Sequence, residues 1–302
     1  RLARRAFVLA LAVCLLLAAC RPQQPAAQAA APPEDDQAVE RPLVKIPLAG
    51  PAAEREAEFS GMAWYGDTLV LLPQYPQRFA GPGYDAAFFT LSKAEILAYL
   101  DGRRSEPLVP SPLPVSNARL AWRTPLFQGF EAIAFAGDQV YVSIESWQGW
   151  SMMGYLMRGQ VMPGLSEIRL DLDSLVRVRP QSRIFNMSEE ALLVDQDWII
   201  SIYEANGAEV SPSPVAHRFD RRLRPAGEIS FPHLDYRITD ASALDEHGRF
   251  WAINFLHPEE RALVPQWQRQ ASQGPSPVRV PVIERLVELQ IIDDSITLTG
   301  TP

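Results

Sequence analysis

The stretch Glu131-Ala-Ile-Ala-Phe-Ala-Gly-Asp-Gln-Val-Tyr-Val-Ser-Ile-Glu145 places two short apolar runs on either side of a Gly-Asp pair. Both runs are rich in β-branched and aromatic residues, which favours strands over a helix. Glycine at the first central position supplies the positive φ of a type II′ turn, so the stretch is predicted to be a β-hairpin. The turn brings Glu145 back beside Glu131, since cross-strand neighbours lie about 5–8 Å apart.

The same pattern recurs three more times, with a polar residue at the start and another fourteen positions later. These repeats run from Ser60 to Gln74, from Glu190 to Glu204 and from Asp240 to Asn254. A small residue follows each start, as the crowded innermost strands of radially arranged sheets require: Gly61, Ala132, Ala191 and Ala241. Recurrence of one hairpin indicates structural repeats around a common centre.

A second strand-like pair follows the hairpins, for example at 215–220 and 226–231, and at 285–292 and 295–299. Four strands per repeat predict an all-β fold, a β-propeller with four recognisable four-stranded blades. The long stretches between repeats leave room for five or six blades. Residues 42–48 are strand-like and are expected to close the ring against the last blade. Apolar spacing over 93–100 predicts a short helix on the outside of the first blade.

The N-terminus has the pattern of a secretory signal. Three arginines precede an apolar run that is too short to span a bilayer, and the run ends in Leu17-Ala-Ala-Cys20. This resembles the bacterial lipobox, which implies a signal peptide over 1–19, cleavage, and lipid on Cys20; an ordinary signal peptide or an uncleaved anchor are the alternatives. Residues 20–41 are rich in Pro, Ala and Gln and are predicted to be a disordered tether, with the propeller domain over 42–302.

The net charge of −8 and the absence of a basic stretch argue against nucleic acid as a partner. The two cysteines, Cys14 and Cys20, fall in the signal and at the lipidation site, so the domain is expected to contain no disulfide. Arg21 rather than Asp follows Cys20; by resemblance to bacterial sorting rules, this favours the outer membrane, facing the periplasm. We expect a monomer whose membrane contact is the lipid.

In a ring of hairpins, the polar ends of all four repeats converge at one mouth of the central channel. Five carboxylates in one funnel repel each other, so they raise their pKa values, stay hydrated or share a cation. Oxygen ligands of this kind suit Ca²⁺ or Mg²⁺. A metal site, a hydrated polar channel and acid–base catalysis without metal all remain open. The ring consists of Ser60, Gln74, Glu131, Glu145, Glu190, Glu204, Asp240 and Asn254.

Long loops are expected to leave the second strand of each hairpin at this same mouth, over 75–85, 146–166, 205–214 and 255–283. Such loops on a rigid scaffold commonly bind something. Trp147, Trp150 and Arg158 are therefore predicted on a ligand-binding loop face, together with Gln74 and Asn254. The alternative is that the aromatic and methionine side chains pack a small lid of their own.

The stretches 59–74, 130–146 and 239–254 resemble the inner hairpins of esterase-like phytase propellers and of the related gluconolactonase-type group. The resemblance implies bound Ca²⁺ and hydrolysis of phosphoesters or lactones. On that pattern Glu131, Glu190 and Asp240 match the metal-binding acidic starts, and Glu145 and Glu204 are the candidates for proton transfer. Ser60 departs from the pattern, and no Lys/Arg cluster suited to a highly phosphorylated substrate is present.

Two functions remain open. The first is an envelope lipoprotein that binds a small-molecule or protein ligand at the loop face over the acidic funnel. The second is a divalent-metal-dependent hydrolase of phosphoesters, esters or lactones, in which Ca²⁺ polarises the substrate and activates water.

Overall fold

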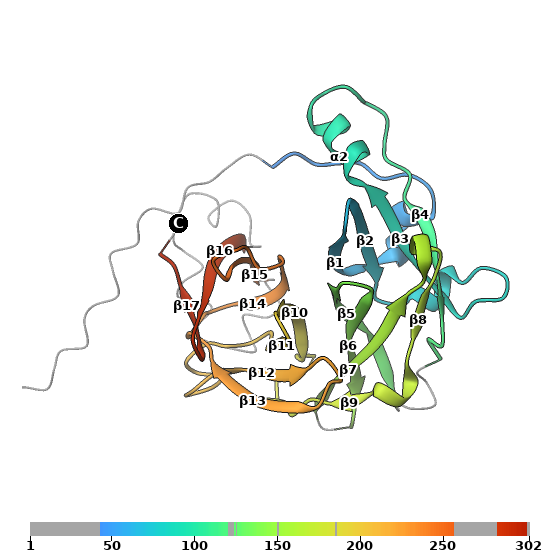
Figure 1. Ribbon diagram of the computed structural model, residues 1–302. Helices are drawn as coiled ribbons and strands as arrows, with labels where there is room; N and C mark the ends of the chain where they lie inside the picture. The colour runs from blue at the N-terminus through green and yellow to red at the C-terminus, as the bar shows by residue number, and fades with distance from the viewer. Residues whose placement is uncertain are drawn as a thin grey trace, which may run out of the picture. The chain divides into compact units, whose positions relative to one another are not determined.

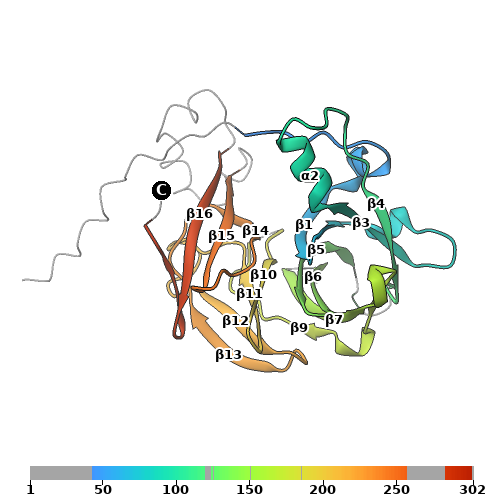
Figure 2. The same ribbon diagram turned by 45° about the horizontal axis from the view of Figure 1, so that its top comes forward.

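The computed structural model describes residues 43–119, 124, 126–149, 151–184, 186–256 and 283–300. Residues 40–302 form one compact unit. Within the described ranges, the strands form two sheets of nine and eight strands, and each sheet contains two consecutive four-stranded antiparallel units joined at their outer edges. Figures 1 and 2 show these units following one another along the chain. The predicted all-β propeller class is therefore confirmed.

Each four-stranded unit, or blade, is built from one continuous part of the chain. The first blade contains β1 (Phe59–Tyr65), β2 (Thr68–Pro73), β3 (Ala86–Ser92) and β4 (Ser111–Ser116). The second contains β5 (Phe127–Ala136), β6 (Gln139–Trp147), β7 (Met152–Val161) and β8 (Ile168–Leu170). The third contains β10 (Glu189–Asp195), β11 (Trp198–Tyr203), β12 (Val215–Asp220) and β13 (Pro225–Ser230). The fourth contains β14 (Arg237–Ala241), β15 (Arg249–Leu256), β16 (Ile283–Ile292) and β17 (Ser295–Leu298).

Short elements fill the connections. Helix α2 (Lys93–Leu100) follows β3, and its N-cap Ser92 accepts a hydrogen bond from the backbone of Glu95. Strand β9 (Val176–Arg177) pairs with β7. Short 3₁₀ turns lie at Pro51–Ala53, Arg55–Ala57, Pro76–Phe79, Pro163–Leu165 and Leu172–Ser174. No helix in the described part of the chain has the length and apolar character needed to span a bilayer.

The innermost strands form a closed circuit. β1 contacts β5 and β14, and β10 contacts the same two strands, so the four repeats meet around one axis. Figure 1 shows these four strands turned toward the middle of the unit. At the periphery, β4 pairs in parallel with β8 and β13 pairs in parallel with β17. The blades are thereby joined two by two at their outer edges.

The hairpin turns have the predicted backbone. Gly66 and Gly137 have φ of 58° and 61°, and Gln196 adopts 48° at the same place in the third hairpin. An unpredicted feature is a register shift near the start of every inner hairpin, for example between Phe59 and Gly61. A β-bulge of this kind re-aims the unpaired residue. The shift includes the repeat start in the first three hairpins, at Ser60, Glu131 and Glu190, whereas in the fourth it falls on Thr239, next to Asp240.

The small residue after each start has the expected steric role. A Cβ atom on Gly61 would lie 3.0 Å from the carbonyl oxygen of Glu131 and 3.2 Å from the Cα of Ala132. Both contacts are with the backbone of β5, so neighbouring inner strands are too close together for a larger residue here.

Three apolar clusters fill three of the blade junctions. One joins the first and second blades around Phe88 and Phe130, one joins the second and third, and one joins the third and fourth around Phe250. Among the described residues, no comparable cluster joins the fourth blade to the first. There the backbone amide of Met62 donates to Asp240 Oδ2 over 3.2 Å. This hydrogen bond links the first strands of the two blades, β1 and β14.

Two sequence predictions about the periphery are wrong. Residues 43–48 contain no strand, and Leu48 instead makes a single bridge to Leu108 beside the first blade, where an apolar cluster covers β2 and β3. The predicted loop 146–166 contains β7. In this strand, a Cβ on Gly159 would lie 2.7 Å from the carbonyl oxygen of Arg169. Glycine is needed there for close strand packing. The helix at 93–100 and the outer strands near 215–231 and 285–299 are confirmed.

Candidate functional site

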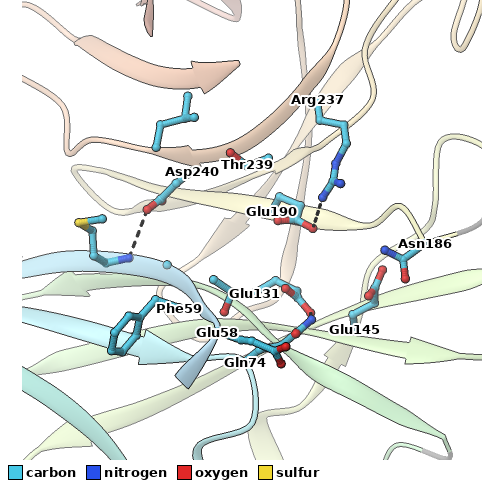
Figure 3. Close-up of a pocket in the computed structure, with 14 residues that line it drawn as sticks. Glu58, Phe59, Gln74, Glu131, Glu145, Asn186, Glu190, Arg237, Thr239 and Asp240 are labelled. Atoms are coloured by element: carbon cyan, nitrogen blue, oxygen red, sulfur yellow. Dashed lines mark hydrogen bonds and ion pairs between the residues drawn. The ribbon is translucent and has the colours of Figure 1, made fainter. Parts of the chain in front are cut away.

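A cavity of about 340 Å³ lies where the polar ends of the inner hairpins meet. Its lining comes from all four blades, through β1, β5, β6, β10, β14, β15 and the residues that flank these strands. Figure 3 shows the carboxyl groups of Glu131, Glu145, Glu190 and Asp240 arranged around it. The residues at its rim, Glu58, Met62 and Asn186, are exposed, whereas the glutamates on its floor are buried.

Backbone contacts between the first two blades fix one wall. The amide of Phe130 donates to the carbonyl of Gln74 over 2.9 Å, and Ser60 Oγ donates to the carbonyl of Phe130 over 2.6 Å. The side-chain amide of Gln74 then donates to Glu131 Oε1 over 3.3 Å. One repeat end, Gln74, and two repeat starts, Ser60 and Glu131, are thus held together across a blade junction.

Arg237, the first residue of β14, supplies the positive charge of the cavity lining. Its Nε donates to Glu204 Oε2 over 2.5 Å, and its guanidinium lies 3.6 Å from Glu190 Oε1. Glu204 is fully buried behind it and also accepts from the backbone amide of Ser188 over 2.6 Å. Arg237 therefore joins the third and fourth blades and is already engaged with two carboxylates.

Glu145, at the end of β6, is the most unusual group of the site. Its side chain lines the cavity, and the residue is only 3 % exposed. Its Oε1 atom is buried and has no hydrogen-bond partner among the described residues. Burial raises the pKa of Glu145 to about 8, with the negative charge of Glu190 adding to the effect and Arg237 opposing it.

The neighbouring carboxyl groups are perturbed in the same direction. Burial, and then the charges of Glu190 and Glu145, raise the pKa of Glu131 well above its ordinary value. Burial and the charge of Glu190 likewise raise the pKa of Glu204. Burial raises the pKa of Asp240 to about 7, against two backbone hydrogen bonds that lower it. At neutral pH the empty cavity therefore retains protons that exposed carboxylates would have lost.

The cavity brings together six residues of the predicted acidic ring: Ser60, Gln74, Glu131, Glu145, Glu190 and Asp240. Glu204 lies behind Arg237. Asn254 is fully buried and does not line the cavity: it donates to the carbonyls of Asp235 (2.9 Å) and Arg237 (3.1 Å). It therefore supports the strand that carries the arginine.

Of the residues predicted on the ligand-binding loop face, Trp147 and Arg158 lie in strands of the second blade. Trp147 ends β6, where it pairs with Met152, and is not part of the cavity lining. Arg158 lies in β7, pairs with Tyr141 further along β6, and makes an ion pair of 3.0 Å with Asp171. Trp150 and Cys20 lie outside the described residues.

Sequence reasoning missed Arg237, Asn186, Thr239 and Glu58, which also line the cavity. The available signal was the basic residue three positions before the acidic start of the last repeat. The contact of Arg237 with Glu190 and Glu204 of the third blade becomes visible only in the folded structure, where the two blades lie side by side.

The predicted metal ligands do not fit a metal centre in this arrangement. Within the described ranges, no three His, Cys, Asp or Glu side chains are grouped so that they could hold an ion. The two oxygens of Asp240 accept from the backbone amides of Met62 (3.2 Å) and Ala241 (2.8 Å). Glu131 accepts from Gln74, and Glu190 pairs with Arg237. We therefore assign no chemical step to a metal ion.

No family model and no curated protein matches the chain. The resemblance to esterase-like phytases and gluconolactonases thus gains no support from these comparisons. Solved structures with similar folds include an α-L-arabinanase from Cellvibrio cellulosa, with a TM-score of 0.43, 11% identity, and 76% of this chain and 69% of that chain covered. For a protein from Bacteroides thetaiotaomicron described as a glycosidase, the TM-score is 0.41 and the identity 8%, with 79% of this chain and 71% of that chain covered. For a hypothetical selenium-binding protein from Sulfolobus tokodaii, the TM-score is 0.36 and the identity 9%, with 78% of this chain and 53% of that chain covered.

Proposed function

We propose that this protein is a ligand-binding β-propeller and that its site is the acidic cavity at the end of the axis. The observation that carries the proposal is Glu145, whose side chain lines the cavity while its buried Oε1 atom has no hydrogen-bond partner among the described residues. A buried polar atom without a partner destabilises a fold by about 1–3 kcal/mol. Groups of this kind are characteristic of sites that are completed by a ligand.

The size and lining of the cavity support a small molecule rather than a protein as the ligand. A volume of about 340 Å³ falls within the range of small-molecule pockets. Gln74, Arg237 and the surrounding carboxyl groups provide several polar contacts on a rigid scaffold, because they are fixed by strands of different blades.

A thermal-shift screen of the purified full-length chain tests this proposal. The library contains cationic, neutral and anionic compounds with molecular volumes below that of the cavity. A compound that binds in the cavity is expected to raise the thermal midpoint of the wild type and of a Glu246→Gln control, but less that of Glu145→Gln. Glu246 is an exposed acid in the turn of the last hairpin, at the other end of the strands. The proposal would be contradicted if no compound raised the thermal midpoint, or if every active compound raised the midpoint of Glu145→Gln as much as that of the wild type.

We also propose that the chain is a lipoprotein anchored to the outer membrane through Cys20. The support is the sequence alone: a basic start, a short apolar run and the Leu17-Ala-Ala-Cys20 motif. Metabolic labelling with a fatty acid tests it. The wild type is expected to take up label and to fractionate with outer membranes, and Cys20→Ala is expected to lose both properties. Unlabelled wild-type protein would refute the anchor.

Hydrolysis remains a second candidate because of one observation. Two carboxyl groups of the cavity, Glu145 and Asp240, have pKa values raised to about 8 and about 7. A carboxylic acid that keeps its proton near neutral pH suits general acid–base catalysis. Assays with aryl phosphates, aryl esters, aryl glycosides and lactones, each with Ca²⁺ or with a chelator, test this candidate. Turnover that is lost in Glu145→Gln would favour an enzyme, and turnover that depends on Ca²⁺ would support the metal hypothesis. If no substrate is turned over, ligand binding is the remaining function.

A further inference from the structure

Hydrogen-bond acceptors outnumber available donors in the cavity. Its buried floor carries the carboxyl groups of Glu131, Glu145 and Glu190. Two of the nearby donors are already engaged, since the Gln74 amide donates to Glu131 and the Arg237 guanidinium contacts Glu190 and Glu204. A ligand that satisfies Glu145 Oε1 brings an N–H or O–H group of its own.

The charge of the lining narrows the choice further. Five acidic residues and one arginine line the cavity, and the arginine is paired. An anionic ligand would face carboxyl groups without a basic partner to receive it. A cavity lined by one sign of charge within low-dielectric walls concentrates its field on the opposite charge. Hydrogen bonds from a charged donor to a carboxylate are also about twice as strong as neutral ones.

Part of the lining is apolar. Phe59, Met62 and Ile253 line the cavity, and the ring of Phe59 is held edge-on against Phe89 at 6.0 Å. Met62 is exposed, so the apolar part of the lining reaches the rim. A ligand with one charged end and an apolar stem would match both parts of the site.

Resting on the proposed ligand-binding function, we propose that the cavity binds an organic amine or guanidine with an apolar stem. The cationic head donates to the unpartnered Glu145 Oε1 and to the neighbouring carboxyl of Glu131. The stem lies against Phe59, Met62 and Ile253 at the entrance side. Arg237 holds Glu190 and Glu204 in place and does not itself contact the head.

Isothermal titration of the full-length chain with a charge-matched series tests the proposal. The probes are n-hexylamine, n-hexylguanidine, neutral n-hexanol and anionic hexanoate, with methylamine as the head without a stem. Each is titrated into the wild type, Glu145→Gln and the Glu246→Gln control. We expect hexylamine to bind the wild type at least about tenfold more tightly than hexanol, because a charged hydrogen bond exceeds this free-energy difference. Methylamine is expected to be weaker than hexylamine by about tenfold or more, since each buried methylene contributes about fourfold.

Glu145→Gln is expected to weaken hexylamine by at least about tenfold and Glu246→Gln to leave it unchanged. Circular dichroism confirms that each variant is folded, and Glu131→Gln serves as a second cavity variant. Hexanol or hexanoate binding as tightly as hexylamine would overturn the cationic ligand. If neutral compounds from the screen bind through Glu145 while the amines do not, the inference fails but the proposed function stands. If no compound of any charge binds, both fail.

Discussion

Replacing Glu145 by glutamine is expected to stabilise the ligand-free protein, and the gain is expected to grow with pH. Glu145 is only 3 % exposed, and burial raises its pKa from 4.5 to about 8. The folded protein therefore binds this proton more tightly than the unfolded chain does. The contribution to stability is most favourable below pH 4.5 and is lost as the pH rises toward 8.

The size of the effect follows from the shift. Each pKa unit corresponds to about 1.4 kcal/mol, so ionisation of this carboxyl lowers the free energy of unfolding by about 3 kcal/mol at pH 7 and by about 1 kcal/mol at pH 5. Glutamine has the same shape, carries no charge, and adds an N–H donor where acceptors are in excess. For a domain of this size, the thermal midpoint is expected to rise by about 6–12 °C at pH 7 and by about 2–4 °C at pH 5.

Thermal unfolding of wild type and Glu145→Gln from pH 5 to pH 8 measures this. The matched control is Glu95→Gln, whose carboxylate accepts from Ser92 and Arg104 in helix α2. These contacts hold the pKa of Glu95 below its ordinary value, so this variant is expected to lose up to about 1 kcal/mol at pH 7. A Glu145→Gln variant that is destabilised, or whose gain does not depend on pH, would refute the reasoning.

Three further substitutions test the packing around the site. Gly61→Ala is expected to lower the free energy of unfolding by about 1–3 kcal/mol, because its Cβ would meet the backbone of β5, whereas Gly81→Ala, in open space, is expected to change it by less than about 0.5 kcal/mol. Asp240→Ala removes the acceptor of the β1 amide and is expected to cost about 1–3 kcal/mol, with a smaller loss for Asp240→Asn. Arg237→Gln leaves Glu204 buried without its cation and is expected to cost about 3–5 kcal/mol at neutral pH. Its loss is expected to shrink at lower pH, because burial raises the pKa of Glu204 and the carboxyl then becomes neutral.

Chemical denaturation with urea measures all three, and each has its own contrary result. Equal effects at the two glycines would mean that the inner strands are not closely packed. An Asp240→Ala variant as stable as the wild type would show that its hydrogen bond does not hold the junction between the fourth and first blades. A loss in Arg237→Gln that grows on acidification would contradict the burial of an ionised Glu204.

The sequence was sufficient to predict the repeated hairpins because their signals are local. Gly66 and Gly137 specify turns, and the apolar runs around them specify strands. The fourteen-residue spacing also placed Glu131 and Glu145 at the same end of their hairpin, where both line the cavity. Such inferences need only the geometry of one strand pair.

The remaining features depend on contacts between blades, which no local pattern specifies. Arg237 enters the site because β14 lies beside β10, and the burial of Glu204 follows from that contact. Arg158 was expected at the loop face because the stretch after the second strand of its hairpin was predicted to be a loop, whereas it forms β7, in which Gly154 and Gly159 allow close packing. The predicted metal ligands were chosen because acidic repeat starts were expected to converge and matched the pattern of the resembled propellers, but the sequence did not show that two backbone amides donate to the oxygens of Asp240.

The most direct test of the shared acidic cavity is an NMR titration of the glutamate and aspartate carboxyl carbons in isotope-labelled, ligand-free protein. The structure predicts that the carboxyl signal of Glu145 titrates at about pH 8 and is absent from the spectrum of Glu145→Gln. It also predicts that the pKa of Glu131 is lower in this variant, because the charge of Glu145 raises it in the wild type. Titration of every carboxyl group below about pH 5, as expected for separate exposed side chains, would contradict the convergence of the four repeats on one buried site.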